Sequence, residues 1–203
     1  MCSSDLALGG LWRDTRVESQ KAYRYEVIPY TLAGARGPAQ AVAFSVPAIP
    51  QLGAVPPKPQ VTLDSLKPLK TAVGWGSFKT GTALNGPLRL GKETFASGVC
   101  IHADGYAVYA RDPAWQRFVA VVGIDESQRP QSQSSVIFSV AAEAADGRRV
   151  LAVSPVIRFG QRERWHFDVA LPKDAERIVL LAESAGDGNK SDHADWCDAG
   201  FSP

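Results

Sequence analysis

Short β-rich runs separated by turn residues constrain the fold of this chain more than any other feature. Within a run the side chains alternate between two faces, as Phe118, Ala120 and Val122 do with their neighbours. Glycine, aspartate and proline mark the connections, and no amphipathic helix is evident. The runs cover residues 72–75, 107–110, 116–123, 135–141, 149–156, 165–169 and 177–183. This pattern predicts an all-β sandwich or jelly roll over residues 61–199.

The N-terminal part carries a separate β pattern over residues 11–46. Residues 21–27 alternate as a strand, a turn rich in glycine follows, and residues 40–46 form the returning strand. A lone hairpin is marginal in water, so the piece is predicted to be an incomplete domain. It resembles the last three strands of a fibronectin type III domain, which makes Tyr23 the corner tyrosine. A hairpin of some other β domain remains the alternative.

A proline-rich linker separates the two parts. Residues 47–60 contain Pro47, Pro50, Pro56, Pro57 and Pro59, which favour a semi-extended chain. The predicted organisation is therefore a partial domain at 11–46, a linker at 47–60 and a main domain at 61–203. Residues 1–10 are interpreted as an artefactual or disordered start, because the string after Met1 resembles translated sequencing adapter. On this interpretation the chain is the tail of a longer protein.

Composition excludes several function classes. The net charge is +1 and no basic block occurs, which argues against nucleic acid as a partner. No apolar run approaches the ~20 residues that span a bilayer, so no membrane association is expected. The chain lacks the GxSxG, HExxH and P-loop motifs, and no other catalytic arrangement is evident. We therefore expect no enzymatic activity from this fragment.

The richest polar cluster lies at residues 183–199. Oxygen-bearing side chains in a glycine-containing loop suit calcium, with Asp187, Asn189, Asp192 and Asp195 as the candidate ligands of a structural Ca²⁺. The spacing is not that of an EF-hand. Two alternatives stay open: a loop whose carboxylates bond nearby amides, and a surface that contacts a ligand.

Two further positions could carry function. His102 ends an apolar run just before a turn, where a histidine is either a hydrogen-bonded core residue or a ligand contact. Trp75 stands between Gly74 and Gly76, so its ring is either a core plug or a stacking platform.

Five motifs, in this order and spacing, resemble the NPCBM family of carbohydrate-binding modules. They are VGWG at 73–76, LGKETFASGV at 90–99 with His102-Ala103, VGIDE at 122–126, AGDGN at 185–189 and DHADW at 192–196. The resemblance covers residues 63–199. It implies a galactose-binding-like jelly roll that serves as an accessory module of bacterial extracellular glycoside hydrolases, often beside fibronectin-like domains.

The resemblance implies a non-catalytic module that binds galactose-type or related glycans. Its expected partners are a glycan and the catalytic domain of the same parent chain, and its expected location is extracellular or periplasmic. The aromatic plane and hydrogen bonds that a sugar needs would come from Trp75, His102, Asp192, His193, Asp195 and Trp196. The alternative is a structural spacer that packs on a catalytic domain, and burial of both tryptophans would favour it.

Cys100 and Cys197 occupy positions where the resembled family usually has small residues. Two such changes in one chain raise the possibility of a disulfide, which an extracellular setting permits. Two reduced, buried thiols are the alternative. A Cα separation beyond ~7 Å would exclude the bridge.

Overall fold

The computed structural model describes residues 17–18, 20–46, 51–131 and 133–203. The chain divides into two compact units, one up to Gln51 and one from Leu52 to Pro203. The predicted N-terminal start at 1–10 and the first part of the linker, 47–50, lie outside the described residues. Of the described remainder of the linker, Gln51 belongs to the first unit and residues 52–60 belong to the second.

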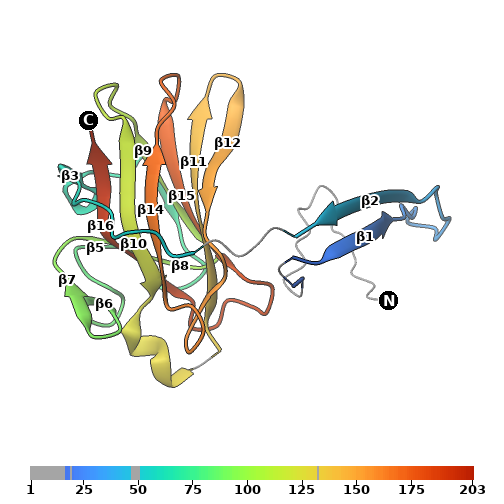
Figure 1. Cartoon of the computed structure of the whole chain (residues 1–203), viewed down its shortest axis with the longest axis horizontal. Coiled ribbons are helices and arrows are strands. Elements are labelled where there is room, and N and C mark those ends of the chain that lie inside the picture. The colour runs from blue at the N-terminus through green and yellow to red at the C-terminus, as the bar shows by residue number, and fades with distance from the viewer. Residues whose placement is uncertain (1–16, 19, 47–50, 132) are drawn as a thin grey trace. The chain divides into compact units, whose positions relative to one another are not determined.

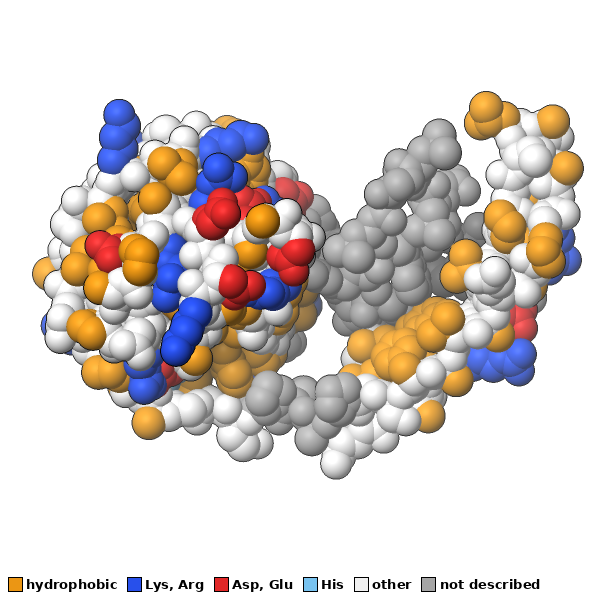
Figure 2. Space-filling model, turned by 90° about the horizontal axis from the view of Figure 1, so that it is seen from above, with side chains coloured by type: hydrophobic (Ala, Val, Ile, Leu, Met, Phe, Trp, Pro, Cys, Tyr) orange, Lys and Arg blue, Asp and Glu red, His pale blue; other side chains and the backbone are white. Residues whose placement is uncertain are grey.

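The first unit contains the predicted hairpin. Strands β1 (Ala22–Val27) and β2 (Gln40–Ser45) pair antiparallel, with Tyr23 opposite Phe44. The Tyr25 and Phe44 rings stack with centroids 5.5 Å apart. Hydrophobic side chains gather on this unit's surface in Figure 2, and Val27, Val42 and Phe44 are among the exposed ones. The likeness to fibronectin type III stays a prediction.

The second unit is the predicted β-sandwich of two main sheets (Figure 1). The β16 sheet has the order β14-β10-β16-β8-β5, and β3 also pairs with β16. Its strands are β14 (Arg164–Ala170), β10 (Arg117–Ile124), β16 (His193–Ser202), β8 (Gly98–His102), β5 (Lys79–Thr80) and β3 (Val61–Thr62). The β11 sheet has the order β12-β11-β15-β9-β4, and β13 also pairs with β11. Its strands are β12 (Gly147–Val153), β11 (Ser135–Ala144), β15 (Arg177–Ser184), β9 (Gly105–Ala110), β4 (Lys70–Ala72) and β13 (Ile157–Arg158).

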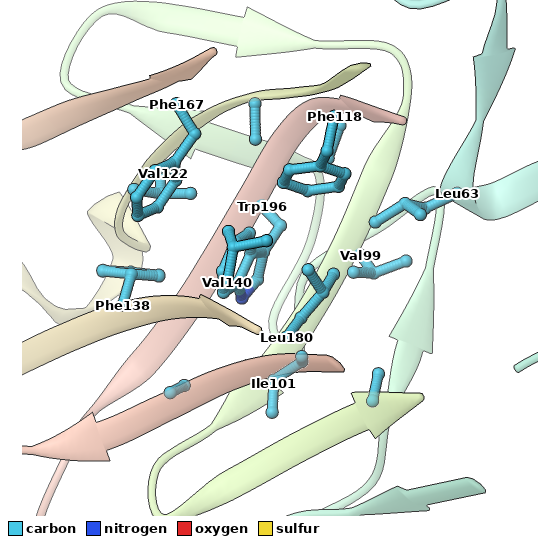
Figure 3. Close-up of a cluster of buried hydrophobic side chains, with 14 of the residues drawn as sticks. Leu63, Val99, Ile101, Phe118, Val122, Phe138, Val140, Phe167, Leu180 and Trp196 are labelled. Carbon is cyan, nitrogen blue, oxygen red and sulfur yellow. The ribbon is translucent and has the colours of Figure 1, made fainter. Parts of the chain in front are cut away.

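The main core fills the space between the two sheets. Trp196 lies at its centre with a fully buried ring (Figure 3). Phe118 and Phe167 reach it from the β16 sheet, and Phe138 reaches it from the β11 sheet. The alternation seen in the sequence places these side chains inward. Burial of aromatic side chains of this size supplies much of a sandwich's stability.

A small two-stranded sheet covers part of the outer face of the β16 sheet. It consists of β6 (Leu88–Leu90) and β7 (Glu93–Phe95). Under it lies a second apolar cluster that includes Leu88, Leu90, Val121, Cys100 and Cys197. Strands β8, β10 and β16 are therefore buried on both faces in this region.

The helical content of the described residues is slight. Two 3-10 helices occur, η1 (Leu63–Ser65) and η2 (Glu126–Gln131). Among the described residues, no helix has the length and apolar character needed to cross a membrane.

Two sequence predictions need correction. Residues 72–75 were expected to form one strand, but β4 ends at Ala72 and Trp75 lies in the following loop. The polar segment 186–198 was expected to be a loop, but its second half begins the ten-residue central strand β16. The cause is burial of β16 on both faces, which lets polar and apolar residues alternate without exposing either set.

Candidate functional site

The site is built around two histidines on neighbouring strands. In the antiparallel pairing of β8 with β16, His102 stands directly opposite His193. Their ring centroids lie 5.1 Å apart in an edge-to-face arrangement. Both side chains are nearly buried. The pairing register therefore joins two residues that are far apart in the sequence.

Trp75 lies against both histidines. Its ring centroid is 5.9 Å from that of His102 and 6.0 Å from that of His193, and it stacks on His193 at 28°. The residue nevertheless remains 62% exposed. The indole thus rests on the histidine pair while it still offers an aromatic surface to solvent. Of the two readings that the sequence left open, the stacking platform is the one that this geometry supports.

The two flanking glycines hold the Trp75 loop close to β8. The Gly74 N–H donates to the His102 carbonyl at 3.1 Å. A Cβ on Gly74 would collide with the backbone of Ala103 and Asp104. Gly76 has φ +72°, a left-handed conformation that favours glycine. The close approach to β8 thus requires glycine at position 74, and the turn that follows favours glycine at position 76.

Burial keeps both histidines neutral near pH 7. It lowers the pKa of His102, and it lowers the pKa of His193 to about 4, where the nearby His102 adds to the effect. His102 Nδ1 lies within hydrogen-bond distance of the Ala103 carbonyl. That nitrogen must carry the proton, which leaves Nε2 as an acceptor. His102 can therefore accept a hydrogen bond from a hydroxyl group at Nε2.

Asp192 anchors the loop that leads into β16. Its Oδ1 accepts a hydrogen bond from the Ser135 N–H at 2.9 Å. Burial raises the pKa of Asp192 to about 7, and the nearby Asp187 and Asp104 carboxylates add to the shift. The side chain is fully buried, so Asp192 holds the loop to β11 and offers no surface to a ligand.

Asp187 ties the same loop to the β11 sheet. It accepts from Ser135 Oγ at 2.5 Å and from Arg158 at 2.8 Å. Ser134 Oγ also donates to the Ser191 carbonyl at 2.8 Å. The sequence analysis did not single out these serines or Arg158. The two serines lie more than fifty residues from their partners in the loop, and Arg158 lies about thirty residues from its partner. The contacts are therefore visible only in the folded structure.

The side chains of Asp195 and Trp196 lie apart from the site formed by Trp75 and the two histidines. Successive residues of β16 point to opposite faces, so Trp196 enters the main core while Asp195 enters the cluster under β6 and β7. Both side chains have no exposed surface. Burial raises the pKa of Asp195 well above its usual range, and the nearby Asp125 adds to the shift. Neither residue offers a surface on which a sugar could stack or bond.

The four predicted calcium ligands are likewise divided. Asp187, Asn189 and Asp192 share the loop before β16, whereas Asp195 belongs to the separate buried cluster. Within the described ranges, no three His, Cys, Asp or Glu side chains come together as a metal site.

Asp104 is a further polar residue of this region. It is exposed and follows Ala103 directly, and its Oδ1 accepts from the Ser184 N–H at 2.7 Å. Its charge acts on both His102 and Asp192. The sequence analysis gave it no role, although its position two residues after His102 was a usable signal.

Cys100 and Cys197 are buried free thiols. They lie on neighbouring strands, but Cys100 stands opposite Asp195 and Cys197 opposite Gly98. Diagonal partners of this kind are about 7–8 Å apart at Cα, which is too far for a disulfide without backbone movement. The reduced alternative is therefore the one that the structure shows. Burial raises the pKa of both thiols well above the usual range, so neither is a reactive thiolate.

Comparison with known proteins agrees with this fold. A curated relative is 31% identical over 137 residues, namely the "Putative endo-alpha-N-acetylgalactosaminidase" of Renibacterium salmoninarum. The match covers 63% of this chain but only 8% of that protein. The chain thus corresponds to a small part of the curated relative.

Two solved structures share the architecture at low sequence identity. One comprises the CBM51-2 and INT domains of ZmpB from Clostridium perfringens, with a TM-score of 0.63 and 23% identity over 90% of this chain and 37% of that one. The other is the CBM51 of a Clostridium perfringens GH95 protein in complex with methyl-galactose. It has a TM-score of 0.59 and 20% identity over 70% of this chain and 99% of that one.

The family model described as "NPCBM/NEW2 domain" matches residues 59–202, which include both sheets of the sandwich and the loop that bears Trp75. This chain therefore belongs to the NPCBM/NEW2 domain family of carbohydrate-binding modules.

Proposed function

We propose that this chain is a non-catalytic module that binds galactose-type or related glycans through Trp75, His102 and His193. In this proposal it serves a larger glycoside hydrolase, outside the cell or in the periplasm, by holding the catalytic domain near its polymer. The observation that carries the proposal is the exposed Trp75 ring on a pair of neutral histidines.

The chemistry of the site suits a neutral sugar. A pyranose ring has an apolar C–H face that can stack on the Trp75 indole and hydroxyl groups that can bond imidazole nitrogens. The site is shallow, so affinities in the millimolar to micromolar range, about −4 to −8 kcal/mol, are expected. Weak binding is sufficient here, because attachment to an enzyme raises the effective concentration of the polymer.

The relatives support a galactose-type ligand without restricting the choice to one sugar. One related structure contains methyl-galactose, and the curated relative is named for N-acetylgalactosamine chemistry. Another related structure, of a ZmpB CBM51-2, contains GlcNAc. We therefore propose galactose and N-acetylgalactosamine as the first candidates and N-acetylglucosamine as the next.

A structural spacer is the alternative function. Burial of both tryptophans would have favoured it, and Trp196 is indeed buried. Trp75 is not, and a spacer gives no reason to keep a large aromatic ring on the surface beside two histidines. The exposed ring therefore favours binding over a purely structural role.

A glycan array with the whole chain tests the proposal. The wild type should retain a set of galacto-configured glycans that the Trp75→Ala variant does not retain. Tyr30→Ala is the matched control, because Tyr30 is equally exposed but lies in the first unit. An array on which the wild type retains no glycan would favour the spacer.

A further inference from the structure

The outer face of the β11 sheet carries a second groove with its own chemistry. It encloses about 480 Å³, within the range of pockets that hold small ligands. Its lining comes from strands β4, β9, β11, β12 and β15, together with Leu69 just before β4. Strands β8 and β16, which carry the histidine pair of the Trp75 site, do not contribute to it.

The strand register explains the floor of the groove. Directly paired residues share one face of a sheet, so each chain of partners forms a row across it. One such row is apolar apart from its first member and runs through Lys70, Val108, Val179, Ala141 and Val150. The neighbouring row on the same face includes Tyr106 opposite Leu181. Val179 and Ala141 of the first row have no exposed surface, so the apolar lining of the groove consists of Leu69, Val108 and the Tyr106 ring.

A third row lies on the opposite side of the Lys70–Val150 row from Tyr106, and its side chains are charged. Arg177, Glu143 and Arg148 pair directly across β15, β11 and β12. Arg148 binds Glu143 at 2.5 Å, while Arg177 makes a longer ion pair of 3.6 Å with the same carboxylate. A guanidinium has five N–H donors, so the long ion pair leaves Arg177 able to bond a second anion.

Lys70 closes the groove at the β4 edge. Its ammonium lies 5.4 Å from the centre of the Tyr106 ring. Together the lining has three cationic side chains, Lys70, Arg148 and Arg177, and one anionic side chain, Glu143. The remaining positive charge lies beside the apolar lining, which complements a ligand that is both ring-shaped and anionic.

Exposed apolar side chains extend this surface. Val150 and Val153 of β12 and Leu69 are exposed at 60%, 48% and 58%. Isolated exposed apolar residues are ordinary, but these lie on one sheet around a groove. Apolar contact with a sugar ring would cover part of this area.

We propose that this groove is a second saccharide site that takes a glycan bearing a carboxylate. The carboxylate would lie between Lys70 and Arg177, and a sugar ring would lie over Val108 beside Tyr106. This site is independent of the proposed glycan contact at Trp75, and it would let the module hold an acidic segment of a polymer while Trp75 holds a neutral sugar.

The test is titration of the whole chain with three carboxylated probes, namely a tetragalacturonate, a hyaluronan tetrasaccharide and sialyllactose. At least one should bind at 50 mM NaCl with a Kd below 10 mM. The Lys70→Gln/Arg177→Gln variant should weaken it at least about fivefold. Lys92→Gln/Lys173→Gln removes the same charge from exposed positions elsewhere and should bind as the wild type does. If the double variant fails to fold, the single variant Lys70→Gln is titrated in its place and should also bind the probe more weakly than the wild type.

Three binding results would overturn the proposal. They are absence of binding by all three probes, whether or not a sulfated tetrasaccharide binds, equal binding of the tetragalacturonate and its neutral methyl ester, and equal loss in the control variant. Loss of binding in Trp75→Ala alone would assign the acidic glycan to the Trp75 site and would also contradict a second site. Failure of the neutral glycans on the array bears only on the Trp75 proposal.

Discussion

His102 and His193 face each other across the β8–β16 pair, with ring centroids 5.1 Å apart, and burial keeps both neutral. Two charged imidazolium rings at this distance would repel each other, so the arrangement depends on their shared neutrality. The indole of Trp75 covers the pair and shields it from water. The Trp75 indole and the histidine pair beneath it therefore depend on each other.

The pKa shifts of Asp192 and His193 predict opposing effects of pH on stability. The folded-state pKa of His193 is about 4, below its unfolded value near 6.5, so its contribution is lost as the pH falls from 6.5 to 4. The folded-state pKa of Asp192 is about 7, above its unfolded value near 3.9, so its contribution is lost as the pH rises from 4 to 7.

Single substitutions should separate these two effects. His193→Gln removes the His193 effect and keeps the Asp192 effect, so the free energy of unfolding should fall more steeply than in the wild type as the pH rises from 4 to 7. In Asp192→Asn the free energy of unfolding should instead fall more steeply as the pH drops below 6.5. Each slope difference is at most about 1.4 kcal/mol per pH unit. Urea titrations at several pH values measure it, and identical slopes in the two variants would contradict the assignment.

Gly74→Ala should damage binding through the Trp75 loop. The new Cβ would meet the backbone of Ala103 and Asp104, so the loop must move away from β8 and carry Trp75 with it. We expect weaker glycan binding than in the wild type even though the indole is retained. Gly53→Ala is the control, because nothing lies within 4 Å of a Cβ at that position. Titration of both variants with the same glycan measures the effect. Unchanged affinity in Gly74→Ala would show that glycan binding does not need the close approach of the Trp75 loop to β8.

Trp196→Ala should unfold or strongly destabilise the domain. The ring is fully buried among Phe118, Phe138 and Phe167, and loss of such a core side chain costs about 3–5 kcal/mol. Thermal melting of the variant measures this loss. Normal stability together with lost glycan binding would instead return Trp196 to the role that the sequence suggested.

The calcium site stays a proposal, now confined to Asp187, Asn189 and Asp192. Calcium that binds the folded loop should give a higher Tm in CaCl₂ than in EDTA, and Asp187→Asn should remove the difference. An equal Tm in both solutions would favour the other reading of this loop, in which its carboxylates bond Ser135 and Arg158.

The sequence predicted the β-sandwich because its core strands alternate visibly, as residues 117–123 do in β10. It also selected Trp75, His102 and His193, which the structure places together. It did not separate them from Asp195 and Trp196, because β16 is buried on both faces and its polar residues resemble a loop. The contact of Asp192 with Ser135 depends on the packing of the loop before β16 against β11, more than fifty residues away in the sequence, which no local pattern reveals.

Titration calorimetry of wild type and Trp75→Ala, with the tightest-binding neutral glycan from the array, tests the central proposal most directly. We expect a rise in Kd of about two- to tenfold for Trp75→Ala, because a stacking contact is worth about 0.5–1.5 kcal/mol. The Tm should stay close to that of the wild type, since the ring is 62% exposed. Equal Kd values for the two proteins, with both folded, would contradict the proposal that Trp75 is the sugar-binding platform.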